Sequence, residues 1–527
     1  MLPGMAPPEN IDLSALPPAL RAAFEAERAA RLALEAEVAA LAERNRRLDH
    51  LVRELRQAIY GKRSEKLAAD ERQLSFEDLE TAISEVEAAP AGAAPARAVT
   101  PAAARRNIGR LPEDLPRVKR VIEPESTLCP CGCGEMARIG EDRSERLDIV
   151  PAQLRVIVTV RPRYACRRCK GAVAQAPAPA RLIEGGLPTE AALAHVLVAK
   201  YADHLPLYRQ AQILARSGVE LDRSTLAAWV GKAAFHLGPI VDRMAEELRR
   251  GDRLFMDETP APVLDPGRGR TKTGYLWALA RDNRRWGGAD PPAVVYAYAP
   301  GRGAEHAERL LQGFSGVLQV DGYAAYKTVN RGRGPEAPLR LAHCWAHGRR
   351  KLREVFDSDA SPIAEEGMRR IAELYAVEAE IRGQGADVRL AARQARSVPL
   401  IAAFRVWLDA ARARVSAKSR VGEKLAYFAR HWDGLALFLE DGRVDMDTNP
   451  VENAIRPLTL NRKNALFAGH DEGGRAWARI ASLIETCKLN GVDPLAWLAA
   501  TLEAIAAGHP ASRIDELLPW NFRAPSS

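Results

Sequence analysis

The stretch Arg253-Leu254-Phe255-Met256-Asp257-Glu258-Thr259 is a short apolar run that leads into acidic residues. A second run of the same character, Gly316 to Asp321, reaches its aspartate 64 residues after Asp257. Apolar runs of this length are typical of buried strands, so we predict strands from Arg253 to Asp257 and from Gly316 to Asp321. If the two strands are neighbours in one sheet, the carboxylates of Asp257 and Asp321 face each other. This pair is the feature from which we predict the fold.

Further elements are predicted around the two runs. Tyr275 to Ala280 and Ala293 to Tyr298 are rich in β-forming residues, and a loop with glycine and proline separates them. Residues 304–314 have a helical pattern, and Leu339 to Ala342 is a candidate fifth strand. Residues 350–445 are predicted to be mostly helical, and a late helix that carries a further acidic residue follows them. Three strands, a helix, a fourth strand and a late acidic helix are the layout of an α/β ribonuclease-H-like catalytic core with a helical insertion.

The late helix starts at Asn449-Pro450 and carries Glu452. Clustered carboxylates are what phosphodiester cleavage by two divalent ions, roughly 4 Å apart, requires. Mg²⁺ prefers such hard oxygen ligands. We therefore predict Asp257, Asp321 and Glu452 as catalytic residues and ligands of two Mg²⁺ ions. A structural alternative exists for Glu452: with Asn449 as N-cap and Pro450 at the first helical position, it occupies the third position of a capping box.

Five of the seven cysteines lie within residues 129–169, which favours a metal site over disulfides. Cys166 and Cys169 form a C-x₂-C knuckle, and Cys129, Cys131 and Cys133 offer the remaining thiolates of a tetrahedral structural Zn²⁺ site. Four of these five would bind, and the spacing leaves open which. The basic residues around the knuckle suit phosphate contact or are solvated charge. An alternating run from Leu154 to Val160 is predicted as a strand.

Residues 187–237 have a helical pattern. One helix is predicted from Thr189 to Tyr201 and a second from Leu207 to Arg216, followed by a turn at Ser217-Gly218. Asp222 or Ser224 can cap a third helix. This succession favours a helix-turn-helix-like DNA-binding module, with Arg223 as a candidate DNA contact, over a plain three-helix packing unit.

A heptad repeat occupies residues 20–60. Leucines recur at every seventh residue, and Val38, Asn45, Val52 and Ile59 fill the other core position. This combination favours a parallel two-stranded coiled coil, and a buried Asn45 can fix its register. A lone amphipathic helix is the alternative. The Ala/Pro-rich segment 88–106 is predicted to be a flexible linker.

Two further groups are candidates for contacts near the catalytic residues. Arg456, Arg462 and Lys463 follow Glu452 and can bind DNA phosphate, or are simply exposed cations. In the segment His343-Cys344-Trp345-Ala346-His347, two imidazoles four residues apart would share a helical face and could form a second metal site. A packed or DNA-facing segment is the alternative. Cys344 and Cys487 have no partner by spacing and are predicted to be buried thiols.

The composition sets limits on these interpretations. The chain has 527 residues, more than one core holds, and its net charge of +8 suits a polyanionic partner without demanding one. The N-terminal residues have no basic segment followed by an apolar one, and the apolar stretch near Trp497 is too short to span a bilayer. We therefore expect a cytoplasmic protein that has no membrane partner.

The sequence resembles the transposases of the insertion-sequence-66 family from about residue 30 to beyond residue 500. The ordered motifs that carry the resemblance are Tyr60 to Lys66 (YGKRSEK), Arg161 to Cys166 (RPRYAC), His204 to Gln210 (HLPLYRQ), Leu221 to Leu226 (LDRSTL), Met256 to Thr259 (MDET), Asp321 to Tyr326 (DGYAAY), Glu452 to Pro457 (ENAIRP) and Arg462 to Gly469 (RKNALFAG). The departure is the extra cysteine among residues 129, 131 and 133.

The resemblance implies that Asp257, Asp321 and Glu452 are the acidic triad of a ribonuclease-H-like domain. It also implies Mg²⁺-dependent cleavage at the terminal inverted repeats of a bacterial insertion sequence, then strand transfer into target DNA. The implied partners are DNA, further copies of the chain joined through the coiled coil, and small accessory proteins of the same element. Such a protein would be associated with the nucleoid.

The expected organisation is multidomain. It comprises a coiled coil for dimerisation (20–86), a linker (87–110), a small zinc-binding β module (111–180), a helical DNA-binding module (181–248), the catalytic domain (249–485, with its insertion at about 350–445) and a C-terminal helical region (486–527). The rival interpretation is a zinc-containing DNA-binding regulator without catalysis, which leaves the two acid-terminated strands unexplained.

Overall fold

The computed structural model describes residue 31 and residues 153–165, 173–265, 270–334 and 338–523. The chain divides into two compact units, one of residues 94–176 and one of residues 1–93 and 177–527. The predicted coiled coil, apart from the helical Arg31, lies outside the described residues, as do the linker and the five clustered cysteines.

In the unit of residues 94–176, a short antiparallel pair joins β1 (Arg163–Ala165) to β2 (Val173–Gln175). The Arg161 guanidinium donates to the Ala176 carbonyl and the Gln175 amide donates back to the Arg161 carbonyl, which extends the pair by one step. The prediction of a strand at Leu154 to Val160 is wrong. That segment has no ladder partner, and its apolar side chains are exposed.

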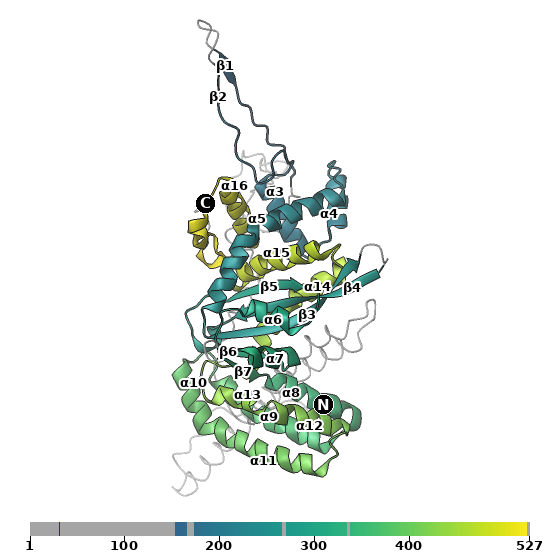
Figure 1. The fold of residues 1–527 in the computed structure, drawn as a ribbon, viewed down its shortest axis with the longest axis vertical. Helices are drawn as coiled ribbons and strands as arrows, with labels where there is room; N and C mark the ends of the chain where they lie inside the picture. The colour runs from purple at the N-terminus through teal and green to yellow at the C-terminus, as the bar shows by residue number, and fades with distance from the viewer. Residues whose placement is uncertain (1–30, 32–152, 166–172, 266–269, 335–337, 524–527) are drawn as a thin grey trace, which may run out of the picture. The chain divides into compact units, whose positions relative to one another are not determined.

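Among the described residues of the other unit, five strands form one mixed sheet in the order β5-β4-β3-β6-β7. The strands are β3 (Arg253–Asp265), β4 (Arg270–Arg281), β5 (Ala293–Ala299), β6 (Gly316–Val320) and β7 (Leu339–His343). Strands β3, β4 and β5 pair antiparallel. Strand β6 pairs parallel with β3, and β7 pairs parallel with β6. The predicted strands are confirmed, including the condition that the Asp257 and Asp321 strands are neighbours (Figure 1).

Strand β3 continues to Asp265, eight residues beyond its predicted end at Asp257, despite Pro260 and Pro262. Its parallel pairing with β6 stops at Phe255, so beyond that point β3 has β4 on one side only. On the other side, the Ala468 N–H donates to the Pro262 carbonyl and the Leu264 N–H donates to the Ala468 carbonyl. Every second residue from Pro260 to Leu264 therefore points its backbone N–H and C=O groups away from β4. Pro260 and Pro262 belong to this set, so they remove no hydrogen bond between β3 and β4.

The edge strand β5 is covered by α15 (Asp471–Leu489). The backbone N–H of Val294 donates to the Thr486 hydroxyl at 3.1 Å, and that of Tyr296 donates to the Ser482 hydroxyl at 2.8 Å. Side-chain hydroxyls thus satisfy backbone groups that an edge would otherwise leave open for another strand.

The helices before the sheet are α3 (Glu190–Tyr201), α4 (Leu207–Arg216) and α5 (Arg223–Arg249), close to the predicted bounds. Asp222 caps α5 by accepting from the Ser224 N–H. The third helix is 27 residues long, so it extends well past a short recognition helix. Its buried side chains belong to one hydrophobic cluster with those of the sheet, α15 and α16 (Pro494–Ala506).

The stretch predicted to be mostly helical, residues 350–445, forms a group of helices at the β7 end of the sheet, called the insertion below (Figure 1). Its elements are α8 (Trp345–Asp359), α9 (Pro362–Glu380), α10 (Ala386–Ala392), a π-helical turn (Arg393–Ser397), α11 (Val398–Arg414), α12 (Arg420–Arg430) and α13 (Trp432–Ala436). Trp345, Phe404 and Phe428 pack together in a second hydrophobic cluster. The insertion therefore has a core of its own.

The remaining helices are α6 (Ala304–Leu310), α7 (Ala324–Gly332) and α14 (Asn449–Ala465), with 3₁₀ turns at Arg284–Trp286, Leu437–Leu439, Ala511–Leu517 and Pro519–Asn521. Helix α6 ends before its predicted limit at Phe314, because Gly313 has a φ of +81° and turns the chain into β6. In the part of the chain that the structure describes, no helix is both long and apolar enough to cross a membrane.

Candidate active site

Asp257 and Asp321 come together through the register of two parallel strands. Phe255 pairs with Gln319, an offset of 64 residues that also separates the two aspartates. Asp257 and Asp321 each follow two residues after this last paired position, so the alternation of side chains directs both to one face of the sheet. Both aspartates are partly exposed.

The carboxylates of Asp257, Glu258 and Asp321 act on one another electrostatically. Burial raises the pKa of Asp257 well above its ordinary value, and the neighbouring charges of Glu258 and Asp321 raise it further. His347 and a hydrogen bond from the Glu258 N–H, 2.8 Å from Asp257 Oδ1, act in the opposite direction. A cation at this place would relieve the repulsion and favour the ionised carboxylate.

Asp321 is held by backbone and side-chain contacts at the end of β6. Its Oδ1 accepts from the Tyr323 N–H at 2.8 Å, and its carbonyl accepts from the Tyr427 hydroxyl at 3.1 Å. Gly322 follows with a φ of +103°, a conformation that suits glycine. The chain therefore turns directly after Asp321 and leaves the carboxylate at the end of the sheet.

Glu258 is an acidic residue of this neighbourhood that the sequence did not single out. It points to the opposite face from Asp257, where Arg302 Nε and the Tyr326 hydroxyl each donate to it at 2.6 Å. Burial and the charge of Asp321 raise its pKa, while these two partners lower it. Its position directly after Asp257 is the sequence feature that could have drawn attention to it. Its contacts hold α7 and Arg302 against the sheet.

Glu452 lies in the first turn of α14 and is 3% exposed. The Thr448 hydroxyl donates to its Oε1 at 2.6 Å, and His347 Nδ1 lies 3.6 Å from the same oxygen. Its other oxygen, Oε2, is buried and has no hydrogen-bond partner. His347 also acts on the pKa of Asp257, so Glu452 and Asp257 have this histidine as a common neighbour.

The capping-box alternative for Glu452 is not what the structure shows. Thr448, not Asn449, is the N-cap residue of α14. The Thr448 N–H donates to Cys344 Sγ, and the Asn449 N–H donates to Asp447 Oδ1, so neither needs the glutamate. The Glu452 carboxylate is therefore held by the Thr448 hydroxyl and lies beside His347.

A buried ionic network fixes the segment that leads into α14. Arg253 of β3 donates to Gln319 and to Asp445, and Arg389 of the insertion donates to the other Asp445 oxygen at 2.9 Å. Burial opposes ionisation of Asp445, yet Arg253, Arg285 and Arg389 together hold its pKa below the ordinary value. Ion pairs thus join β3, the insertion and the segment that leads into α14.

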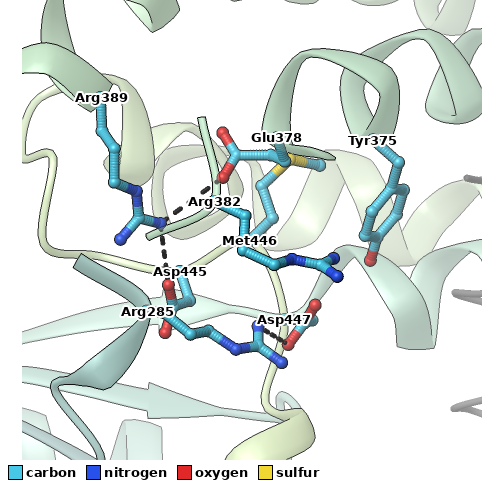
Figure 2. Close-up of a pocket in the computed structure, with 8 residues that line it drawn as sticks. All are labelled: Arg285, Tyr375, Glu378, Arg382, Arg389, Asp445, Met446 and Asp447. Carbon is cyan, nitrogen blue, oxygen red and sulfur yellow. Dashed lines mark hydrogen bonds and ion pairs between the residues drawn. The ribbon is translucent and has the colours of Figure 1, made fainter. Parts of the chain in front are cut away.

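Figure 2 shows the pocket at the centre of this network. Arg285 pairs with Asp447 at 2.9 Å, and Arg389 lies between Asp445 and Glu378. The volume is about 20 Å³, which is enough for roughly one water molecule. The pocket is therefore a small gap among ion-paired side chains and too small to be a substrate cavity.

The predicted DNA-contacting residues lie on two elements. Arg456, Arg462 and Lys463 share α14 with Glu452, and Arg456 is one turn after it. Arg462 also donates to the Pro260 carbonyl at 2.6 Å, so it ties α14 to β3. Arg223 is exposed at the start of α5 and makes no part of the acidic cluster.

The two imidazoles of residues 343–347 do not share a helical face. His343 ends β7 and its ring lies tilted against that of His431, with 4.2 Å between ring centroids, whereas His347 lies in the first turn of α8. The expected buried thiols Cys344 and Cys487 are confirmed. Thr448 was missed as a neighbour of Glu452, whereas the segment with His347 was expected near the catalytic residues without Glu452 being named as its partner. The C-x₂-H spacing of Cys344 and His347 was the available signal.

Comparisons with known proteins agree along the chain. A family model described as "Transposase IS66 family" matches residues 185–476, and "IS66 C-terminal element" matches residues 482–520. Residues 126–170 match "zinc-finger binding domain of transposase IS66", and residues 47–120 match "Transposase C of IS166 homeodomain". The zinc-finger match contains all five clustered cysteines.

Full-length relatives are found in Sinorhizobium fredii. The uncharacterized protein y4jD is 48% identical over 477 residues, which cover 89% of this chain and 93% of the relative. The uncharacterized protein y4qI is 46% identical over 520 residues, which cover 95% and 94%.

Proposed function

This chain belongs to the IS66 family of transposases, and we propose that it cleaves and joins DNA through Asp257, Asp321 and Glu452 with Mg²⁺. The observation that carries the proposal is the register of β3 and β6, whose 64-residue offset also separates Asp257 and Asp321. His347, which lies 3.6 Å from Glu452 and acts on the pKa of Asp257, supports the inclusion of Glu452. The chemistry is phosphodiester hydrolysis followed by transesterification.

The residues present fit divalent metal ions. Asp257 carries a raised pKa because burial and like charges oppose its ionisation, and Glu452 has a buried oxygen without a hydrogen-bond partner. Both features favour a cation between the carboxylates. Bound Mg²⁺ would activate the attacking hydroxyl and neutralise charge on the phosphate and the leaving oxygen. Asp257 and Asp321 would hold the ions, and Glu452 would complete the second site.

The sheet supports a ribonuclease-H-like assignment for the catalytic domain. The antiparallel strands β3, β4 and β5 come first in the chain, and the parallel strands β6 and β7 extend the sheet from β3. Asp257 and Asp321 follow the point where β3 and β6 end their pairing. In this arrangement the protein supplies positioned carboxylates and no nucleophile. Water, and then the freed 3′-hydroxyl of the DNA, would attack phosphorus.

The other modules would bring DNA and protein copies to this centre. Four of Cys129, Cys131, Cys133, Cys166 and Cys169 would hold the structural zinc implied by the zinc-finger match. Arg223 would contact the terminal inverted repeats, with Arg456, Arg462 and Lys463 near the cleaved phosphate. The predicted coiled coil would join two copies, and small proteins of the same element would assist.

The proposal is tested by incubating the purified protein with labelled DNA that contains the ends of its own element, with Mg²⁺ or with EDTA. We expect nicking at the ends and joining to target DNA in Mg²⁺ only. Cleavage without joining would reduce the function to a nuclease. Binding without cleavage in Mg²⁺ would favour a regulator and contradict the proposal.

A further inference from the structure

Cys344, His347 and Glu452 form a cluster with mixed ligand chemistry. One ligand atom from each, a sulfur, a nitrogen and an oxygen, lies within 4.8 Å of the others, and all three residues are buried. They come from the first turns of α8 and α14 and from the residue that caps α8. Two helix N-termini therefore converge on one small volume.

The environment of Cys344 suits a negatively charged sulfur. Cys344 is the N-cap residue of α8, where the helix dipole favours anions. The Thr448 N–H donates to its Sγ at 3.4 Å. No disulfide engages this thiol, which is 0% exposed. The sulfur is thus placed as a ligand would be.

The other two ligands are already held in place. His347 follows Cys344 by three residues, so both side chains lie on one face of the start of α8. Glu452 is oriented by the Thr448 hydroxyl, and its buried Oε2 has no hydrogen-bond partner. An unpartnered carboxylate oxygen with a 4% exposed side chain points to a bound cation.

We propose that Cys344, His347 and Glu452 bind one thiophilic divalent ion of the Zn²⁺ class, at a site separate from the zinc-finger cysteines. Thiolate, imidazole and carboxylate leaving one position open are a common zinc ligand set, whereas Mg²⁺ does not take sulfur. The site shares Glu452 with the proposed catalytic triad. Occupancy therefore withdraws Glu452 from Mg²⁺ and inhibits cleavage, a consequence that rests on the proposed function.

Binding is tested with Co²⁺ as the spectroscopic probe, on full-length protein that keeps its zinc-finger ion. We expect wild type to bind one more Co²⁺ than Cys344→Ser, with a sulfur-to-cobalt charge-transfer band that the variant lacks. Loss of a ligand should weaken this extra site about tenfold or more. His347→Gln should weaken it too, and Cys487→Ser, which removes the other described buried thiol, should not.

Equal stoichiometry and equal spectra for wild type, Cys344→Ser and His347→Gln would overturn the site. Thermal unfolding of each variant shows whether it is folded, and either of the two ligand variants is sufficient for the comparison. The inhibition is measured separately, as each protein's DNA cleavage rate with Zn²⁺ divided by its own rate without Zn²⁺. We expect Cys344→Ser to need about tenfold more Zn²⁺ for the same inhibition. Absent cleavage with intact Co²⁺ binding would contradict the proposed function and leave the site standing.

Discussion

The hydroxyl of Thr448 donates to Glu452 Oε1 at 2.6 Å, one helical turn away and out of contact with solvent. This contact holds the carboxylate beside His347, which also acts on the pKa of Asp257. Orientation of a metal ligand by a second hydrogen-bonded group commonly accounts for 10- to 100-fold in affinity or activity, as an order of magnitude. Thr448 is therefore a positioning residue for Glu452.

Thr448→Val keeps the shape of the side chain and removes the hydroxyl. We expect DNA cleavage to fall about 10- to 100-fold and the Mg²⁺ concentration for half-maximal rate to rise, since Glu452 loses its orientation. Thr448→Ser, which keeps the hydroxyl, should recover most of the rate. The measurement is a Mg²⁺ titration of cleavage. An unchanged titration in Thr448→Val would rule out the positioning role.

Asp445→Asn tests the buried network that joins the insertion to α14. The substitution leaves Arg253 without its ion-pair partner and Arg389 with Glu378 alone in a buried network, and breaking a buried ion pair typically destabilises by about 3–5 kcal/mol. We expect the thermal unfolding midpoint to fall by several degrees or more. Glu380→Gln is the matched control, because it breaks an exposed pair with Arg396 and should change stability by about 1 kcal/mol or less. Equal midpoints for both variants would refute the role given to the network.

Acid should destabilise the fold through His343 and His431. Burial lowers the pKa of His343 to about 4, and burial with the charge of His343 lowers that of His431 to about 3. Because both folded values lie below the unfolded value of about 6.5, their stability contribution is complete above pH 6.5 and is lost as pH falls toward 4 and 3. Each histidine contributes a loss of up to about 1.4 kcal/mol per pH unit in that window.

The check is the unfolding midpoint measured between pH 7 and pH 4 for wild type and His431→Phe. The variant should lose stability less steeply, since one of the two titrating rings is gone. Parallel pH dependences would show that His431 does not carry this effect.

Arg223→Gln tests the exposed cation at the start of α5 as a phosphate contact. We expect weaker binding to element-end DNA and a salt dependence whose slope, log affinity against log salt, is smaller in magnitude by about one. Arg412→Gln, an exposed arginine of α11, is the matched control and should change neither quantity. An identical slope for Arg223→Gln and wild type would remove Arg223 from the DNA interface.

The fold was predictable where a local sequence pattern, or a constant separation between two residues along the chain, indicates it. Apolar runs identified the strands, and the 64-residue separation of Asp257 and Asp321 proved to be the register of a parallel pair. The extension of β3 through Pro260 and Pro262 was not predictable from propensity. It depends on β6 ending its pairing at Gln319, so that proline nitrogens face an unpaired side.

The surroundings of the site depend on contacts that no local pattern encodes. Thr448 meets Cys344 across 104 residues, and Arg253 meets Asp445 across 192. Such pairs form only when the insertion packs on the sheet, because a buried arginine is stable only with its partners in place. Sequence reasoning therefore proposed the three acids, but it found neither the hydroxyl that orients Glu452 nor the residue that caps its helix.

The most direct test of the central claim is end cleavage in Mg²⁺ by Asp257→Asn, compared with Asp265→Asn on the same strand. Asp257→Asn removes one charged oxygen from the cluster and should lower the cleavage rate by about a hundredfold or more, whereas Asp265→Asn should cleave like wild type. Both variants should keep the wild-type unfolding midpoint within a few degrees. Wild-type cleavage by Asp257→Asn would contradict the assignment of this carboxylate and, with it, the proposed acidic triad.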